Sequence, residues 1–411
     1  MSLGKDSIEK FLFVLSQGDL SLLELKSVIS RNPGWNVSIG QSAANSIVLE
    51  TSEKTAIKLI KALGSSYKVA RILGFDVRES LSLLDLPFHD KFNYTVSGYD
   101  CSEDEYQEAR QELHLLLKRK GLGKTKYLEP QIRLEKNERI IATEIKASEI
   151  LDRVLSPASE IYGIDFLIQG GFPGGKSAYA QTIEVFDVEG YDERDFKRPY
   201  QDPTKTVSPR LARLLVNLAI TEETRSLLDP FAGLGTVLQE ALLSQVSVIG
   251  VDRDQSLVDK AKANLRWLKE KYAVAKNKQI NLFAYDARRI SRARMPIVDA
   301  IASEPILLPI FKVNPTPARG REAMQNAASI YERSIREFGE ILASSKNGRL
   351  VITSPRLFDS SGRSSSLDLL SIATSNGFRP YSSDLRVNYP FQIESSKKKI
   401  IQRDLFVFHR A

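Results

Sequence analysis

Residues 226–241 read S-L-L-D-P-F-A-G-L-G-T-V-L-Q-E-A, and this stretch decides the fold of the second half of the chain. A short apolar strand runs into D-P-F-A-G-x-G-T, and a helical pattern with an apolar inner face follows directly. Glycines at such a turn let the backbone approach a ligand closely, and the start of a helix offers free amide donors. We therefore expect a ligand-binding loop at the first strand of a doubly wound α/β domain.

The loop differs from the dinucleotide-binding fingerprint. G-L-G is not continued as G-x-G-x-x-G, and Pro230 directly follows Asp229. An acid at the strand tip repels a pyrophosphate, whereas it attracts a cationic ligand or one that carries an ammonium group. The pattern favours a cationic ligand.

Three further apolar strands follow, and each leads into polar residues. The strand at 246–252 ends in Asp252, about 20 residues after the loop, where a carboxylate can accept from both hydroxyls of a ribose. The strand at 280–287 reaches Asp286, which is placed to accept from the exocyclic amine of an adenine. The strand at 296–301 leads into A-S-E-P-I-L-L-P at 302–309. A single such acid is usually a turn former or helix cap, but three in succession indicate a nucleoside with a cationic, ammonium-bearing tail, which describes S-adenosylmethionine.

The first 75 residues alternate between strand and helix periods in the order β-α-β-β-α-β, which is a ferredoxin-like pattern. The expected elements are a strand at 11–15, a helix at 21–29 opened by a serine cap, a hairpin of 34–37 with 46–49, a helix at 51–63 and a strand that starts at 67–70.

A second small α+β unit follows, and then a polar, proline-punctuated segment at 189–209 that is typical of a linker. Ser102 and Glu105 have the spacing of a capping box at the start of a helix. G-G-F-P-G-G-K at 170–176 predicts a hairpin loop rather than a phosphate cradle, because no helical pattern follows it. The other expected elements are a strand at 92–99, a helix at 102–120, a helix at 143–154 and strands at 163–168 and 178–186.

Size and composition limit the classes of protein. A chain of 411 residues exceeds one hydrophobic core and predicts two or three domains. A net charge of +7 and a pI near 9.2 favour an anionic partner, most commonly nucleic acid, although a merely basic protein fits as well. One cysteine and three histidines exclude an internal disulfide and leave too few ligands for a Cys/His zinc site, so we expect no metal. With neither a secretory signal nor a membrane span in the sequence, we expect a cytoplasmic protein that does not contact membrane.

The chain resembles the tRNA guanine-N2 methyltransferases that act at position 10, which are found in archaea, as the eukaryotic catalytic subunit, and with bacterial relatives. D-P-F-A-G-L-G-T carries this resemblance, together with F-L-F-V-L at 11–15, R-D-F-K-R-P at 194–199 and S-P-R-L-A-R-L-L-V-N-L-A at 208–219. The resemblance implies an α/β architecture with a class I Rossmann-like methyltransferase domain behind two small α+β RNA-binding domains. The implied parts are a ferredoxin-like domain at 1–78, a THUMP-like domain at 79–188, a linker at 189–209 and an S-adenosylmethionine-dependent methyltransferase domain at 210–411.

The resemblance also implies residue roles. Asp252 holds the ribose and Asp286 the adenine, while Arg210 either pairs with the methionine carboxylate or is a solvated arginine at a helix start. The implied cofactor-binding residues are Asp229, Pro230, Phe231, Gly233, Gly235, Thr236, Asp252, Asp286, Ala287 and Arg210.

The fourth strand departs from the family pattern. Relatives carry D-P-P-Y or N-P-P-F there, and this chain has the implied catalytic residues Ser303, Glu304 and Pro305, followed by Ile306 against the base. Serine can still accept a hydrogen bond and proline keeps the turn rigid, but isoleucine offers no π face for stacking. Glu304 has no counterpart in the family pattern. It either accepts from the amine and N1–H edge of guanine or pairs with a basic side chain and leaves the site inactive, the candidates being Lys312, Arg319 and Arg321.

RNA contacts should be mostly electrostatic and directed to phosphates, although any run of charge can also be a solvated face. The candidates are Lys197 and Arg198 in the linker, Lys397, Lys398 and Lys399 in the final hairpin, and Lys118, Arg119, Lys120, Lys124 and Lys126.

The function that fits these observations is S-adenosylmethionine-dependent methylation of tRNA or another structured RNA, with N2-methylguanosine as the product. Two alternatives stay open: methylation of another exocyclic amine in ribosomal RNA or DNA, and a non-catalytic tRNA-binding protein with a degenerate methyltransferase fold. The sequence leaves open whether a small activator subunit takes part and which oligomeric state the protein adopts.

Overall fold

The computed structural model describes most of the chain and divides it into two compact units, Met1–Gly190 and Tyr191–Ala411. The described residues are 7–43, 45–87, 89–137, 139–155, 162–202, 207–273, 275–305, 308–345, 347–381, 390–393 and 400–411. Within this part of the chain, every helix is too short or too polar to cross a membrane.

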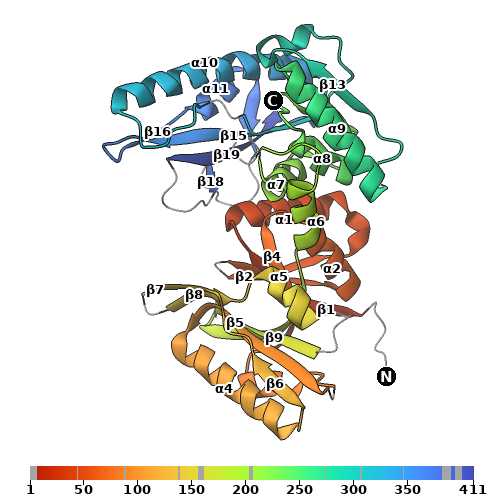
Figure 1. Cartoon of the computed structure of the whole chain (residues 1–411), viewed down its shortest axis with the longest axis vertical. Coiled ribbons are helices and arrows are strands. Elements are labelled where there is room, and N and C mark those ends of the chain that lie inside the picture. The colour runs from red at the N-terminus through yellow and green to blue at the C-terminus, as the bar shows by residue number, and fades with distance from the viewer. Residues whose placement is uncertain are drawn as a thin grey trace. The chain divides into compact units, whose positions relative to one another are not determined.

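The N-terminal unit begins with the predicted β-α-β-β-α-β order, which is confirmed (Figure 1). Its first elements are β1 (Ile8–Leu15), α1 (Asp19–Arg31), the 3-10 turn η1 (Pro33–Trp35), β2 (Ser38–Ala43), β3 (Ser46–Ser52), α2 (Glu53–Ala62) and β4 (Ser66–Gly74). The strands pair in the order β2-β3-β1-β4, and the pairs are antiparallel. The helix at α1 starts from Gly18, so the predicted serine cap was wrong.

The rest of the N-terminal unit extends the same sheet, because β4 pairs with β10. Its elements are α3 (Val77–Ser82), β5 (Lys91–Ser102), α4 (Glu103–Arg119), β6 (Lys124–Tyr127), β7 (Ile132–Lys136), β8 (Arg139–Glu144), α5 (Ala147–Ile150), the π-helical turn η2 (Leu151–Leu155), β9 (Tyr162–Phe172) and β10 (Lys176–Val185). The capping box of Ser102 and Glu105 is present, and residues 173–175 form the predicted hairpin turn. The predicted start of the helix at 143–154 was wrong, since Thr143 lies within the strand β8.

The C-terminal unit alternates strand and helix as predicted. Its elements are α6 (Val188–Phe196, which begins before the unit boundary), α7 (Pro209–Ala219), β11 (Ser226–Asp229), α8 (Thr236–Leu243), β12 (Ser247–Asp252), α9 (Gln255–Tyr272), β13 (Ile280–Ala284), the 3-10 segment η3 (Ala287–Arg292), β14 (Ala300–Ser303), α10 (Pro317–Ile341), the 3-10 turn η4 (Leu342–Ser344), β15 (Arg349–Phe358), β16 (Ser364–Ser366), α11 (Leu369–Ser375), β17 (Phe378–Pro380), β18 (Phe391–Ile393) and β19 (Ile401–Arg410). The main sheet has the order β13-β12-β11-β14-β15-β19-β17, with β11 to β15 parallel and β19 antiparallel to β15.

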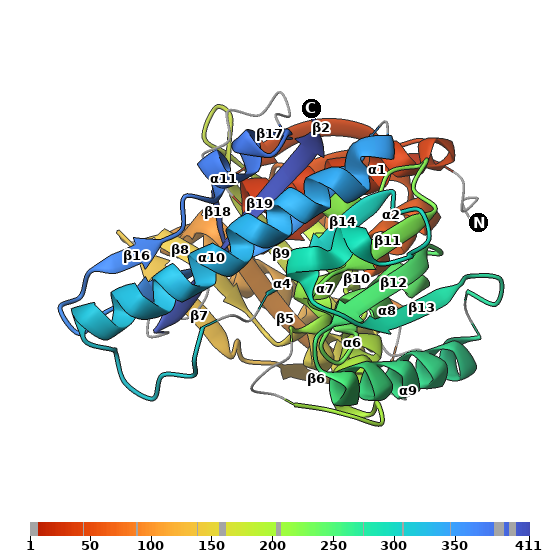
Figure 2. The same ribbon diagram turned by 90° about the horizontal axis from the view of Figure 1, so that it is seen from above.

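Helices cover both faces of this sheet, which confirms the doubly wound α/β class. Figure 2 shows the long helix α10 crossing one face, where Tyr331, Ile335 and Phe338 pack on buried strand residues such as Leu350 and Phe408. Helices α7, α8 and α9 pack beside one another on the other face. The strand order reverses between β11 and β14, and open α/β sheets bind ligands beyond the carboxyl ends of the strands at such a point.

The segment predicted as a linker contains regular and buried structure. Helix α6 occupies its first part, and Arg194 within it is buried against Glu240, with 2.7 Å between Nε and Oε1. Polar composition was a poor guide here, because these polar side chains pair with each other instead of with water. The remaining boundaries of the predicted domains stay predictions.

Candidate active site

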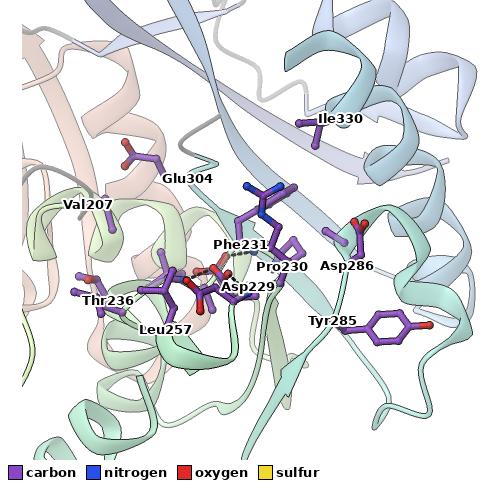
Figure 3. A pocket seen from close by; sticks show the side chains of 18 of the residues that line it. Val207, Asp229, Pro230, Phe231, Thr236, Leu257, Tyr285, Asp286, Glu304 and Ile330 are labelled. Carbon is purple, nitrogen blue, oxygen red and sulfur yellow. Dashed lines mark hydrogen bonds between the residues drawn. The ribbon is translucent and has the colours of Figure 1, made fainter. Parts of the chain in front are cut away.

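A cavity of about 530 Å³ lies at the carboxyl ends of β11 to β14 (Figure 3). Figure 3 shows Asp229, Pro230 and Phe231 between Glu304 on one side and Asp286 with Tyr285 on the other. The cavity therefore brings together the ends of four strands that are far apart in the sequence. The residues that line it are Val207, Asp229, Pro230, Phe231, Ala232, Gly233, Leu234, Thr236, Val237, Asp252, Arg253, Asp254, Leu257, Tyr285, Asp286, Ala287, Arg288, Glu304, Leu308, Pro309, Ile310 and Ile330.

The loop between β11 and α8 forms the floor of the cavity, and glycine allows its shape. Gly233 and Gly235 have φ angles of 51° and 83°, which side chains rarely adopt. The amide of Gly235 donates to the carbonyl of Ala232 at 2.7 Å, so the loop closes a tight turn just before the helix begins. A side chain at 235 would also lie 3.3 Å from Cβ of Ala261, which leaves little space between α8 and α9.

Asp229 is a buried carboxyl at the centre of the site. Its Oδ1 accepts from the hydroxyl of Ser303 at 2.5 Å and from the amide of Phe231 at 3.1 Å. Burial raises the pKa of Asp229 to about 7, against the opposing effect of these two hydrogen bonds, and the charges of Asp252 and Glu304 raise it further. The carboxyl therefore gains or loses its proton near neutral pH.

Ser303 does not line the cavity, because its side chain is fully buried and donates to Asp229. We expected the serine hydroxyl to accept from a target amine, and the structure instead gives it the task of orienting Asp229. Pro305 is buried and also lies outside the lining. Ile306 lies outside the described residues.

Asp252 ends β12 and supports the loop. Its Oδ2 accepts from the amide of Gly233 and its Oδ1 from the amide of Asp254, each at 3.0 Å. Each carboxylate oxygen has two lone pairs, so both can still accept a hydroxyl from the cavity side. The arrangement fixes the carboxylate at the rim without using up its capacity as an acceptor.

Asp286 is held by Arg288, two residues further along the chain. The guanidinium of Arg288 donates to both oxygens at 2.6 to 3.1 Å, and its backbone amide donates to Oδ1 at 2.9 Å. These bonds, led by the side-chain bond from Arg288, lower the pKa of Asp286. Arg288 and Arg253 also line the cavity and were not predicted from the sequence.

Glu304 lines the cavity directly after β14 and is 7% exposed. Its Oε1 accepts from Nε of Arg403, a residue of β19 that lies ninety-nine positions away in sequence. Glu304 does pair with a basic side chain, as one of the two expectations had it, but the partner is Arg403 and was not among the candidates Lys312, Arg319 and Arg321. Of those candidates, Arg319 lies over the ring of Phe311, 5.6 Å from its centre.

The remaining predicted residues divide between cavity and surroundings. Pro230, Phe231, Gly233, Thr236 and Ala287 line the cavity, whereas Gly235 and Arg210 lie outside the lining. The positions of Lys397, Lys398 and Lys399 lie outside the described residues.

The two basic residues of the predicted linker differ in exposure. Arg198 is 2% exposed and donates to Oγ1 of Thr236 at 2.7 Å, so the prediction that it contacts an RNA phosphate was wrong. It supports the first turn of α8 instead. Lys197 is exposed, with its ammonium 3.7 Å from Glu193, and the basic residues from Lys118 to Lys126 are exposed as well.

Comparison with known proteins finds methyltransferases that part of this chain resembles. Residues 196–306 match the UPF0020 family, described as an RMKL-like methyltransferase domain. A tRNA (guanine(10)-N2)-dimethyltransferase of Pyrococcus abyssi is 34% identical over 176 residues, which is 42% of this chain and 45% of that protein. The protein of the same name from Methanothermobacter thermautotrophicus is 34% identical over 126 residues, or 30% of this chain and 34% of that protein. The chain thus matches less than half the length of each relative.

A solved structure shows the same fold over nearly the whole chain. The crystal structure of a possible methylase from Clostridium difficile 630 covers 98% of this chain and 99% of its own, with a TM-score of 0.51 and 12% identity. At this identity the likeness concerns the fold alone.

Proposed function

We propose that the chain is an S-adenosylmethionine-dependent RNA methyltransferase that forms N2-methylguanosine in tRNA. One observation carries the proposal: the cavity lies where the strand order of the sheet reverses, and its lining is acidic although the chain has a net charge of +7. Two arginines face a larger set of acids, namely Asp229, Asp252, Asp254, Asp286 and Glu304. Such a lining attracts a cationic ligand and opposes a phosphate.

The residues present fit the proposed cofactor. Asp252 would hold the ribose through the capacity left on its oxygens, while Tyr285, Asp286 and Ala287 would meet the adenine, and the loop from Asp229 to Gly233 would hold the methionine part. The tRNA methyltransferases of similar sequence support this choice. S-adenosylmethionine supplies an electrophilic methyl group on a sulfonium centre.

The chain itself would bind, orient and accept a proton. The exocyclic amine of the base must approach the cavity on the side of Glu304 and give up one proton as it gains the methyl group. Glu304 is the acid on that side and would accept this proton. Ser303 is not available for the amine, because its hydroxyl donates to Asp229. General base assistance of this kind typically contributes about 100- to 10,000-fold to the rate.

Calorimetric titration with S-adenosylmethionine tests the first half of the proposal. We expect binding in the micromolar range that Asp229→Ala abolishes, because this change removes the acceptor for both Ser303 and the loop amide. Wild-type protein without such binding, or an Asp229→Ala variant with unchanged affinity, would refute the assigned site.

Nucleoside mass spectrometry tests the second half. Unmodified tRNA incubated with the protein and S-adenosylmethionine should gain N2-methylguanosine, and Glu304→Ala should slow the transfer while leaving cofactor affinity unchanged. A methyl group on an adenine or cytosine amine, in tRNA, ribosomal RNA or DNA, would contradict the proposed substrate. Cofactor binding without transfer to any of these would favour the non-catalytic alternative.

A further inference from the structure

The ion pair between Glu304 and Arg403 joins two segments of the C-terminal unit that are distant in sequence, and Glu304 lines the cavity. The side chain of Glu304 is 4% exposed and that of Arg403 is 34% exposed. Arg403 lies in β19, where it is opposite Pro355 of β15 and Ile393 of β18. A strand near one edge of the sheet therefore supplies the cation for an acid that directly follows another strand, β14.

Other groups around Glu304 have interactions of their own. Tyr331 is fully buried and donates to the carbonyl of Thr353 at 2.7 Å, and Ser303 donates to Asp229. Burial raises the pKa of both Asp229 and Tyr331, and the negative charge of Glu304 raises each further. A charged carboxylate in such a place needs a cation to offset the loss of water, and Arg403 is the cation at Oε1.

We propose that Arg403 is the positioning residue that fixes the carboxylate of Glu304, and that the pair selects a target base with two adjacent N–H donors. The inference rests on the proposed function and names the group that reads the base. Arg403 occupies Oε1 through its Nε, which restricts rotation of the carboxylate, while a carboxylate has about four acceptor sites in all.

The chemistry of the bases explains the selection. Guanine presents N1–H and the N2 amine side by side, and a carboxylate can accept from both at once. Adenine and cytosine place a ring nitrogen with a lone pair beside the amine, and this lone pair is repelled by the carboxylate. The Glu304–Arg403 pair would thus recognise the base through a carboxylate that accepts two hydrogen bonds, whereas the hydroxyl of Ser303 is used by Asp229.

A base analogue tests this selection directly. 2-Aminopurine keeps the N2 amine of guanine but lacks N1–H, so it offers only one of the two donors. After the methylated guanosine has been located in tRNA treated with wild-type protein, tRNA with 2-aminopurine at that position is prepared. Wild-type protein should prefer guanosine in kcat/KM by about 10-fold or more, because a hydrogen bond to a charged group is lost with 2-aminopurine.

Variants of both partners complete the experiment. Arg403→Gln and Glu304→Gln should reduce this preference to about 2-fold or less, and Arg403→Gln should lower kcat more than it raises KM, with S-adenosylmethionine affinity unchanged. Arg403→Lys keeps the positive charge and should restore part of the preference. Arg356→Gln is the matched control, since Arg356 pairs with Asp404 in the same sheet and lies outside the cavity lining, and it should keep the full preference.

The outcomes separate this inference from the proposed function. Wild-type protein that binds no cofactor and methylates no tRNA overturns both. Active wild-type protein together with an Arg403→Gln variant that melts normally and keeps the preference for guanosine overturns the inference alone. Equal loss of preference in Arg356→Gln also overturns it, because the effect would then come from the sheet and not from the Glu304 pair.

Discussion

The buried carboxyl of Asp229 should make the C-terminal unit less stable as the pH rises, and Asp229→Asn should remove this effect. The pKa of Asp229 is raised from 3.8 to about 7 in the folded protein, mainly by burial. Between these two values the folded state holds a proton that the unfolded state has released, so stability falls as the pH rises from about 4 to about 7. At 1.36 kcal/mol per pH unit, the full effect above pH 7 is about 4 kcal/mol.

Asparagine keeps the shape and the acceptor but cannot become charged. Its Oδ1 can accept from Ser303 and from the amide of Phe231 as the carboxylate does. Its buried amide group brings new donors, which cost about 1 to 2 kcal/mol if they find no acceptor. We therefore expect Asp229→Asn to be more stable than wild type by about 2 to 3 kcal/mol at pH 8 and about as stable as wild type at pH 5.

Urea unfolding at the two pH values measures this difference. The chain has two tryptophans, Trp35 in the N-terminal unit and Trp267 in the C-terminal unit, so a Trp35→Phe background leaves fluorescence as a reporter of the unit that contains Asp229. Asp286→Asn is the control with the opposite sign, because Arg288 lowers the pKa of Asp286 and its removal should not stabilise the unit at pH 8. An Asp229→Asn variant that is no more stable than wild type at pH 8, or whose difference does not change with pH, would refute the reasoning.

Three further changes test packing and buried charge. Gly250→Ala should destabilise the C-terminal unit by about 1 to 3 kcal/mol in urea unfolding, because the new Cβ would lie 2.5 Å from Cδ1 of Leu238; a neutral result would show that the helix shifts freely. Lys68→Met should lower the stability of the N-terminal unit by about 3 to 5 kcal/mol, because the buried Asp165 loses its partner at 3.0 Å; thermal unfolding followed by circular dichroism measures this, and an unchanged midpoint would contradict it. Glu240→Gln should lower the stability of the C-terminal unit by a similar amount in the same thermal unfolding measurement, since two buried arginines share this carboxylate. A loss of stability no larger than that of a glutamate substitution at the surface would contradict this expectation.

Features set by neighbouring residues could be predicted from the sequence. Apolar periods predicted the ferredoxin-like order and the strands of the C-terminal unit, and the spacing of Ser102 and Glu105 predicted the capping box, because each depends on residues within about one helix turn or one strand. The loop at 229–235 was predicted for the same reason. Its glycines and its acid are local, and the sheet then brings the strand ends together.

Features set by distant partners could not be predicted. Arg198 and Arg194 are in a polar segment with the composition of a linker, yet both are buried because Thr236 and Glu240 of a later helix accept from them. The short strands β6 and β7 were missed, since each spans only four or five residues and the residues of β7 are exposed throughout. Arg403 had no local signal at all, because only the order of strands in the sheet brings it to Glu304.

The acids of the cavity also show why counting charges in a sequence is not enough. Asp229, Asp286 and Glu304 each stand at or just after the end of a strand and are equivalent as sequence features. In the fold, burial raises the pKa of Asp229 to about 7, Arg288 lowers the pKa of Asp286, and Arg403 stabilises the charge of Glu304. Titration of Asp229 therefore changes the charge of the cavity near neutral pH. A cationic ligand should accordingly bind more tightly at pH 8 than at pH 6, and Asp229→Asn should remove this difference, because burial brings the pKa of Asp229 into that range.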